Sequence, residues 1–91
     1  MKILITYASA HGTTQSIAER IESRMAATNI GVVTILPMDK NPHLGDYGVL
    51  IVGSSIHAGS WLSPATRFLK FSTGFLKEQP KPTWAFSVGS K

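Results

Sequence analysis

The sequence contains no cysteine, which excludes disulfide bonds, thiolate chemistry and metal sites built on cysteine. Its three histidines, His11, His43 and His57, lie far apart and lack the usual spacing of metal ligands. Acidic residues are also few. The five Asp and Glu side chains are scattered, and no pair of them indicates acid–base catalysis. We therefore expect neither a metal site nor a catalytic nucleophile.

Long apolar runs are absent as well. No run approaches the ~18 residues that a membrane-spanning helix needs, so we expect no integral membrane segment. A strand pattern begins at the N-terminus and leaves no room for a signal peptide, which predicts a cytoplasmic protein. The 91 residues are 43% hydrophobic, as is typical of one small globular domain.

Basic residues exceed acidic ones, nine to five, and give a net charge of +4. They are scattered along the chain, so no nucleic-acid groove is expected. The simplest interpretation is a solvated surface, and the alternative is an anionic ligand or partner.

The stretch 2–14, KILITYASAHGTT, reads as a buried strand, a tight loop and the first turn of a helix. Backbone N–H groups at a helix start favour anions, and Gly12 lets the backbone approach a ligand closely. Ser9, Thr13 and Thr14 add hydroxyl donors. The loop therefore predicts a phosphate site. The alternative is an ordinary turn capped by Thr13 or Thr14, with His11 as an exposed loop residue.

The remaining pattern alternates apolar strands with amphipathic helices. We expect a helix over 14–27, a strand over 32–36 and a loop over 38–47. A strand over 49–52 is apolar on both faces, as in the centre of a parallel sheet. Residues 53–55 follow as this strand ends, and we then expect a glycine-bearing loop over 56–61. The next helix is expected to start with Ser63 as its cap and Pro64 in its first turn, to bury Ala65, Phe68, Leu69 and Ser72, and to break or kink at Gly74. A linker with Pro80 and Pro82 precedes a last strand over 84–88.

This order predicts an α/β fold with a parallel sheet, whose ligands bind beyond the carboxyl ends of the strands. Both polar loops, 9–14 and 56–61, follow strands at that edge. Trp61, in the second loop, either covers the core or stacks on an aromatic ring of a ligand. Tyr7 and Trp84 are expected to be core or strand residues.

The loop Ser9-Ala10-His11-Gly12-Thr13-Thr14 resembles the phosphate loop of the flavodoxin-like family. Ser9, Gly12 and Thr14 match the family pattern, whereas His11 replaces its usual hydroxyl residue. The stretches 53–59, 64–70 and 84–88 are similar to the branch that contains menaquinone-dependent protoporphyrinogen oxidase.

This resemblance implies a flavodoxin-like doubly wound parallel sheet, truncated to four strands in the order 2-1-3-4. The single domain 1–91 would lack the family's fifth strand and last helix. FMN would bind where strands one and three meet, and nothing in the chain is expected to be catalytic. The implied cofactor-binding residues are Ser9, Ala10, His11, Gly12, Thr13, Thr14, Ser54, Ser55, Ile56, His57, Ala58, Gly59, Trp61, Ser87, Val88 and Gly89.

Three functions follow from the resemblance. The first is an FMN-dependent oxidoreductase of the protoporphyrinogen oxidase type, with a quinone or porphyrinogen substrate. The second is an electron-transfer flavodoxin, although a charge of +4 differs from the acidic members that dock basic reductases. The third is a non-catalytic partial domain that needs a partner chain. Because Trp84 and Phe86 would lie on an exposed edge strand, we also expect a homo-oligomer or a partner chain along that edge.

Overall fold

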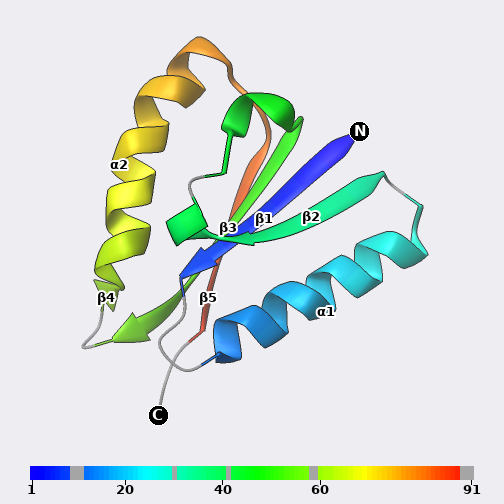
Figure 1. Ribbon diagram of the computed structural model, residues 1–91, viewed down its shortest axis with the longest axis horizontal. Coiled ribbons are helices and arrows are strands. Elements are labelled where there is room, and N and C mark those ends of the chain that lie inside the picture. Colours follow the sequence, from blue (N-terminus) through cyan, green and yellow to red (C-terminus); the bar gives the residue numbers. More distant parts are fainter. Residues whose placement is uncertain (9–11, 30, 41, 58–59, 89–91) are drawn as a thin grey trace.

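The computed structural model describes residues 1–8, 12–29, 31–40, 42–57 and 60–88, without the side chains of Thr13 and His57. Parallel strands form the centre of the molecule (Figure 1). Their order is β2-β1-β3-β5, which confirms the predicted order, with β5 as the strand expected fourth. The bounds are Lys2–Ala8 for β1, Val32–Pro37 for β2, Val49–His57 for β3 and Thr83–Val88 for β5.

Two helices cover opposite faces of this sheet (Figure 1). Helix α1 (Thr13–Ala27) connects β1 to β2, and helix α2 (Ser63–Glu78) connects β3 to β5. The two connections leave the centre of the sheet in opposite directions. Because crossover connections between parallel strands are right-handed, two crossovers in opposite directions place their helices on opposite faces of the sheet.

Alternation along the strands divides the core into two layers. Leu4, Leu50 and Val52 face α2 and pack with Ala65 of that helix. The alternate side chains of the same strands face α1. The buried residues of this second layer are Ile3, Ile5, Tyr7 and Ile51 of the strands and Ala18 of the helix. The central strand β3 is therefore buried on both faces, as its apolar run predicts.

Strand β3 is longer than the sequence predicts. It continues to His57, although the strand was expected to end before residues 53–55 and a loop to begin at Ile56. Ser54 still pairs with β1 and β5, and Ser55 still pairs with β5. The extra strand β4 (Ser60–Trp61) then pairs antiparallel with the end of β3. The polar residues of this stretch thus lie on a strand and a short hairpin.

Helix α2 differs from the prediction at three positions. Its N-cap is Leu62, so Ser63 and Pro64 belong to the first turn. Leu69 is 39% exposed and was wrongly expected in the core. The helix runs through Gly74 without a break, because the buried Ala65 and Ser72 hold its inner face to the sheet while Gly74 is exposed.

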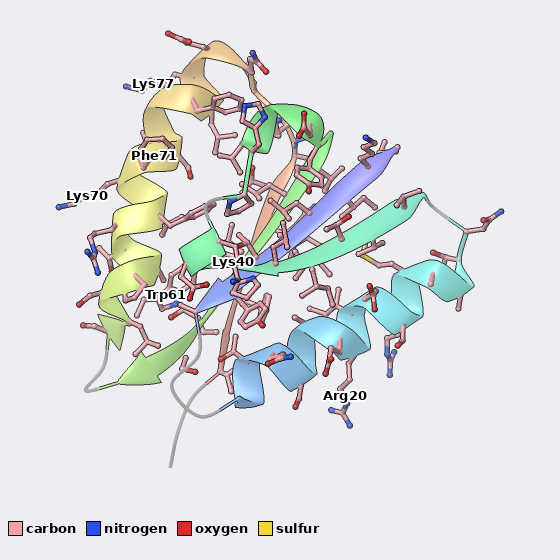
Figure 2. The ribbon with its side chains drawn as sticks, in the orientation of Figure 1. Arg20, Lys40, Trp61, Lys70, Phe71 and Lys77 are labelled. Atoms are coloured by element: carbon pink, nitrogen blue, oxygen red, sulfur yellow. The ribbon has the colours of Figure 1, made fainter. Side chains whose placement is uncertain are left out.

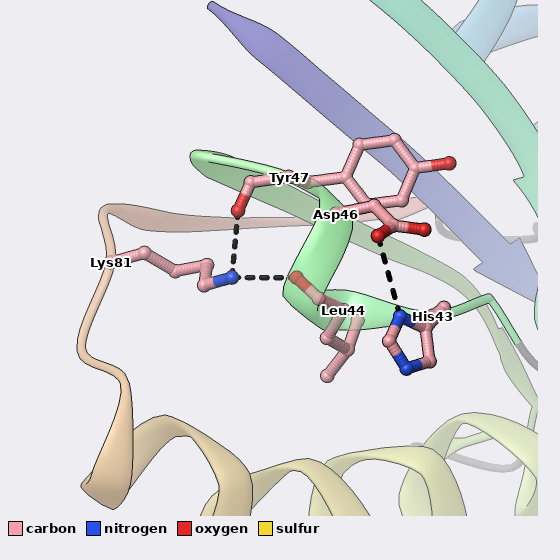
Figure 3. A network of polar contacts seen from close by, with 5 residues as sticks. All are labelled: His43, Leu44, Asp46, Tyr47 and Lys81. Atoms are coloured by element: carbon pink, nitrogen blue, oxygen red, sulfur yellow. Dashed lines mark hydrogen bonds and ion pairs between the residues drawn. The ribbon is translucent and has the colours of Figure 1, made fainter.

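The predicted loop 38–47 contains two short 3₁₀ turns, η1 (Met38–Lys40) and η2 (Leu44–Asp46). Figure 3 shows how Lys81 ties the second turn to the segment before β5. Its Nζ donates to the carbonyl oxygens of Leu44 (2.6 Å) and Tyr47 (2.7 Å). The ammonium also lies 5.2 Å from the Phe75 ring centroid. These contacts fix where the chain enters β5.

Strand β5 is an edge strand within the described residues, where it pairs with β3 alone. Trp84 lies on it as expected, but its side chain is 67% exposed and does not enter the core. Tyr7, by contrast, is buried in β1. None of the described helices is both long and apolar enough to cross a membrane.

Candidate functional site

The candidate site lies at the carboxyl ends of β1, β3 and β5. The register places Ala8 of β1 beside Ser54 of β3, and Ser54 beside Ser87 of β5. Ser55 and Val88 are paired one residue further along. The chain leaves β1 toward β2 and leaves β3 toward β5, so β1 and β3 flank the switch point where doubly wound sheets bind ligands.

Gly12 begins α1 in a conformation that suits an anion site. It is the N-cap, with φ 80° and ψ −9° in the left-handed region, where glycine is favoured. The predicted threonine cap is therefore wrong, because the N-cap residue is Gly12 and it has no side chain to form a cap hydrogen bond. A Cβ built at Gly12 meets nothing within 4 Å. Among the described residues, the space beside the Gly12 Cα is therefore open, and the N–H groups of a helix's first turn have no acceptor within the helix.

Thr14 and Ser55 connect α1 to β3 across the switch point. Their hydroxyl oxygens lie 2.6 Å apart in a hydrogen bond, and the Thr14 side chain is fully buried. Both residues were predicted to contact the cofactor. That contact stays a prediction, and in the structure their hydrogen bond holds the start of α1 against the end of β3.

Ser54 connects the end of β3 to the start of α2. Its hydroxyl donates to the Ser55 carbonyl oxygen (2.8 Å) and accepts from the Leu62 N–H (3.2 Å), and its side chain is fully buried. Leu62 is the N-cap of α2, so this contact fixes where that helix begins. Ile56, also predicted for the site, is half-buried and pairs with Trp61 in the β3–β4 hairpin.

Trp61 and Ser87 bring the loop after β3 to the end of β5. The Trp61 indole N–H donates to the Ser87 Oγ at 2.8 Å. Figure 2 shows Trp61 beside the start of α2, and its ring packs on the core layer that faces this helix. Two segments predicted to contact one ligand, separated by 26 residues, therefore meet in the structure.

The other predicted residues are described in part or not at all. Thr13 lies in the first turn of α1 and His57 at the end of β3, both by their backbone only. Six predicted residues fall outside the described residues, namely Ser9, Ala10, His11, Ala58, Gly59 and Gly89.

A hollow of about 180 Å³ opens beside this edge, and the sequence analysis missed it. Burial, with smaller contributions from the Glu19 and Asp39 carboxylates, raises the pKa of the Tyr7 hydroxyl above its usual value of 10.0. Tyr7 is therefore a neutral hydroxyl at physiological pH. The sequence signal for this hollow was Asp39, an acidic residue in the η1 turn that directly follows β2. The hollow is lined by Tyr7, Ala8, Pro37, Met38, Asp39, Leu62 and Pro64.

The arrangement fits a ligand that carries a phosphate and a flat aromatic ring. The open helix start at Gly12 can take the phosphate, and the Trp61 indole and the end of β5 can border the ring. Among the described residues, no group of three or more His, Asp or Glu side chains could hold a metal ion.

Comparison with known proteins gives one family. The family model of the flavodoxin domain matches residues 4–90. No curated protein sequence matches the chain.

Solved structures share the fold. Rubredoxin oxygen:oxidoreductase from the anaerobe Desulfovibrio gigas is 25% identical, with a TM-score of 0.82 over 98% of this chain. The flavodiiron protein from Giardia intestinalis is 21% identical, with a TM-score of 0.81 over 98% of this chain. The chain spans only 23% of the length of each. A flavodoxin from the domain Archaea is 17% identical, with a TM-score of 0.73, and this chain covers 85% of it.

Proposed function

Because this chain belongs to the flavodoxin domain family, whose cofactor is FMN, we propose that it is a redox domain that binds FMN at the carboxyl edge of β1, β3 and β5. The observation that carries the proposal is the switch point itself. There, the open helix start at Gly12 and the Thr14–Ser55 hydrogen bond lie on one side, and the Trp61–Ser87 contact lies on the other. The predicted cytoplasmic location belongs to the same proposal.

The phosphate end of the site is the loop 9–14 and the first turn of α1. Backbone N–H groups at a helix start bind a dianion directly, and the helix dipole adds a partial positive charge. Ser9, Thr13 and the neighbouring backbone would donate to the phosphate oxygens. Thr14 would hold the first turn of α1 in place through its hydrogen bond to Ser55.

The ring would lie against the two segments that the Trp61–Ser87 hydrogen bond joins. The half-buried indole offers an apolar face that would exclude water from one side of the ring. The end of β5, with Val88, would border the other side. When bound, FMN carries one or two electrons, and the protein contributes its binding, its orientation and the polarity around it.

A titration that compares FMN, riboflavin and inorganic phosphate tests this proposal. We expect FMN to bind with quenching of its fluorescence, and phosphate to compete with it. Riboflavin lacks the phosphate, and charge-assisted hydrogen bonds contribute about 1.5–3 kcal/mol, so its affinity should be roughly ten-fold to a hundred-fold lower. Equal affinity for riboflavin and FMN would contradict a phosphate site at Gly12.

Electron transfer is the activity that the flavodoxin and flavodiiron neighbours favour, and we propose it first. A second candidate is an oxidoreductase of the protoporphyrinogen oxidase type, which would pass electrons from a porphyrinogen to a quinone. Its support is the hollow that Tyr7 and Asp39 line beside the edge, together with the resemblance of residues 53–59. The comparisons reported above add nothing to it. A third candidate is a partial domain that needs a partner chain.

Anaerobic turnover separates these candidates. The FMN-loaded protein is mixed with protoporphyrinogen and menaquinone, and porphyrin fluorescence is followed. An oxidoreductase produces porphyrin at a rate that depends on both substrates. An electron carrier produces none, yet its dithionite-reduced form reduces a one-electron acceptor such as ferricyanide. A partial domain shows neither activity and binds no FMN.

A further inference from the structure

The outer face of α2 exposes more apolar surface than a solvated helix needs. Phe71 is 81% exposed and Leu69 is 39% exposed. Phe68 and Phe75 are half-buried and flank Phe71 at helical spacing. This surface lies away from the Gly12 end of the candidate site, on the other side of the sheet from α1 (Figure 1). The proposed FMN function does not account for it.

Two hollows lie along this face and share a wall. One, of about 400 Å³, lies toward η1 and the start of α2, and the other, of about 320 Å³, lies toward η2. Phe68 and Phe71 line both, so the two hollows form one α2 groove that the Phe71 ring divides. The apolar lining of the α2 groove is Met38, Pro42, Leu44, Pro64, Phe68, Phe71 and Phe75.

Three basic side chains of α2 lie near Phe71. Arg67 lines the groove, and Figure 2 shows Lys70 and Lys77 projecting from α2 on either side of Phe71 along the helix. Within the described part of the chain, these three cations form no salt bridge. Helix α2 itself carries a single acid, Glu78 at its end, whereas Asp39 borders the groove from η1 and Asp46 of η2 pairs with His43. The surface thus combines apolar hollows with a helix face on which three cations stand against one acid.

We propose that the α2 groove docks an acidic amphipathic segment of a partner protein. Two apolar side chains of that segment fill the hollows on either side of Phe71, and its carboxylates face Arg67, Lys70 and Lys77. A second copy of this chain would present the same basic face and be repelled. A flat lipid surface can accept Phe71, but it leaves both hollows unfilled, whereas a polypeptide fills them with side chains. The partner would lie beside Trp61 and leave the Gly12 end of the candidate site open.

Fluorescence anisotropy with a synthetic peptide tests this proposal. The probe is a labelled helical peptide with leucines at one-turn spacing and glutamates on its flanks. A matched peptide carries lysine in place of every glutamate. The chain is compared with Phe71→Ser and with the double variant Lys70→Glu, Lys77→Glu. The control is the double variant Arg20→Glu, Arg24→Glu, which makes the same charge change at exposed positions of α1. Circular dichroism verifies that each variant is folded.

The expected result is binding of the acidic peptide that weakens with added salt. Both α2 variants should lower the affinity at least about ten-fold, and the α1 control should leave it within about two-fold. The lysine peptide should bind far more weakly than the acidic one. The proposal is overturned if the acidic peptide does not bind, or if the α1 control weakens binding as much as the α2 variants do. It is also overturned if the chain co-sediments with anionic phosphatidylglycerol vesicles but does not bind the acidic peptide.

Discussion

Gly53 occupies a position in β3 where no side chain fits. A Cβ built there would lie within the Phe86 ring, which packs across the strand pair from β5. We expect Gly53→Ala to destabilise the protein by about 1–3 kcal/mol, because the ring or the strands must shift. Urea denaturation measures this loss. An unchanged midpoint would show that Phe86 does not pack on Gly53 in solution.

Substitutions at Gly12 test the phosphate end of the candidate site. Gly12→Val forces a β-branched residue to φ 80°, at a cost of roughly 1–3 kcal/mol, and places its side chain in the space that a phosphate would occupy. We expect the affinity for FMN to fall more than stability alone explains. Gly12→Asn separates the two effects, because asparagine tolerates this conformation but still occupies the space. If both variants bind FMN like the parent chain, the helix start does not hold the phosphate.

Tyr7 gives a pH dependence with a definite sign. Burial raises the pKa of its hydroxyl above 10.0 in the folded chain, so the unfolded chain loses this proton first as the pH rises. The contribution of Tyr7 to stability is therefore full below pH 10.0 and is lost as the pH rises through the folded pKa. Tyr7→Phe should flatten the alkaline part of the plot of unfolding free energy against pH. Parallel curves for the two proteins would contradict this account.

The sequence predicted which residue types lie at the candidate site, but it did not predict which of them contact one another. The hydroxyl and glycine residues at both strand ends were found because they interrupt apolar runs. Their partners were not, since the Thr14–Ser55 and Trp61–Ser87 bonds join positions 41 and 26 residues apart. Periodicity reports only which face of an element is buried, and it carries no information about such pairs. Ser54 illustrates the limit, because its buried hydroxyl supports the start of α2.

Helix α2 is the element that sequence rules described least well. Its predicted break at Gly74 followed the low helix propensity of glycine, but packing of the inner face decides the outcome. Gly74 is exposed, and a Cβ there meets nothing within 4 Å. We expect Gly74→Ala to stabilise the chain by about 0.5–1 kcal/mol in urea denaturation. A loss of stability would indicate that the helix is not continuous there.

Helices, strands and their order were predictable because each apolar stripe is long and regular. The extension of β3 and the short strand β4 were not, because serine and glycine have little preference for strands and pair there only through their neighbours. The exposure of Trp84 has a similar cause. Trp84 lies on the edge strand β5 and is exposed there, and strand periodicity does not report how far a helix covers an edge strand.

For the whole molecule, the open edge at β5 predicts association. Its backbone groups face no described strand, and Trp84 exposes 67% of its surface beside them. We expect concentration-dependent self-association in analytical ultracentrifugation. Trp84→Lys should weaken it, because a charge on an edge strand opposes pairing. The parent chain would contradict this expectation by remaining monomeric at millimolar concentration.

The central claim is that FMN binds at the carboxyl edge, and ¹H–¹⁵N NMR during an FMN titration tests it most directly. The chain has two indole N–H signals, from Trp61 at that edge and from Trp84 on the exposed strand β5. The account predicts that FMN shifts the Trp61 indole signal and the backbone signals of Gly12, Ser55 and Ser87. The Trp84 indole and Phe71 should stay in place. Shifts confined to α2 or to Trp84, with Trp61 and Gly12 unchanged, would contradict it.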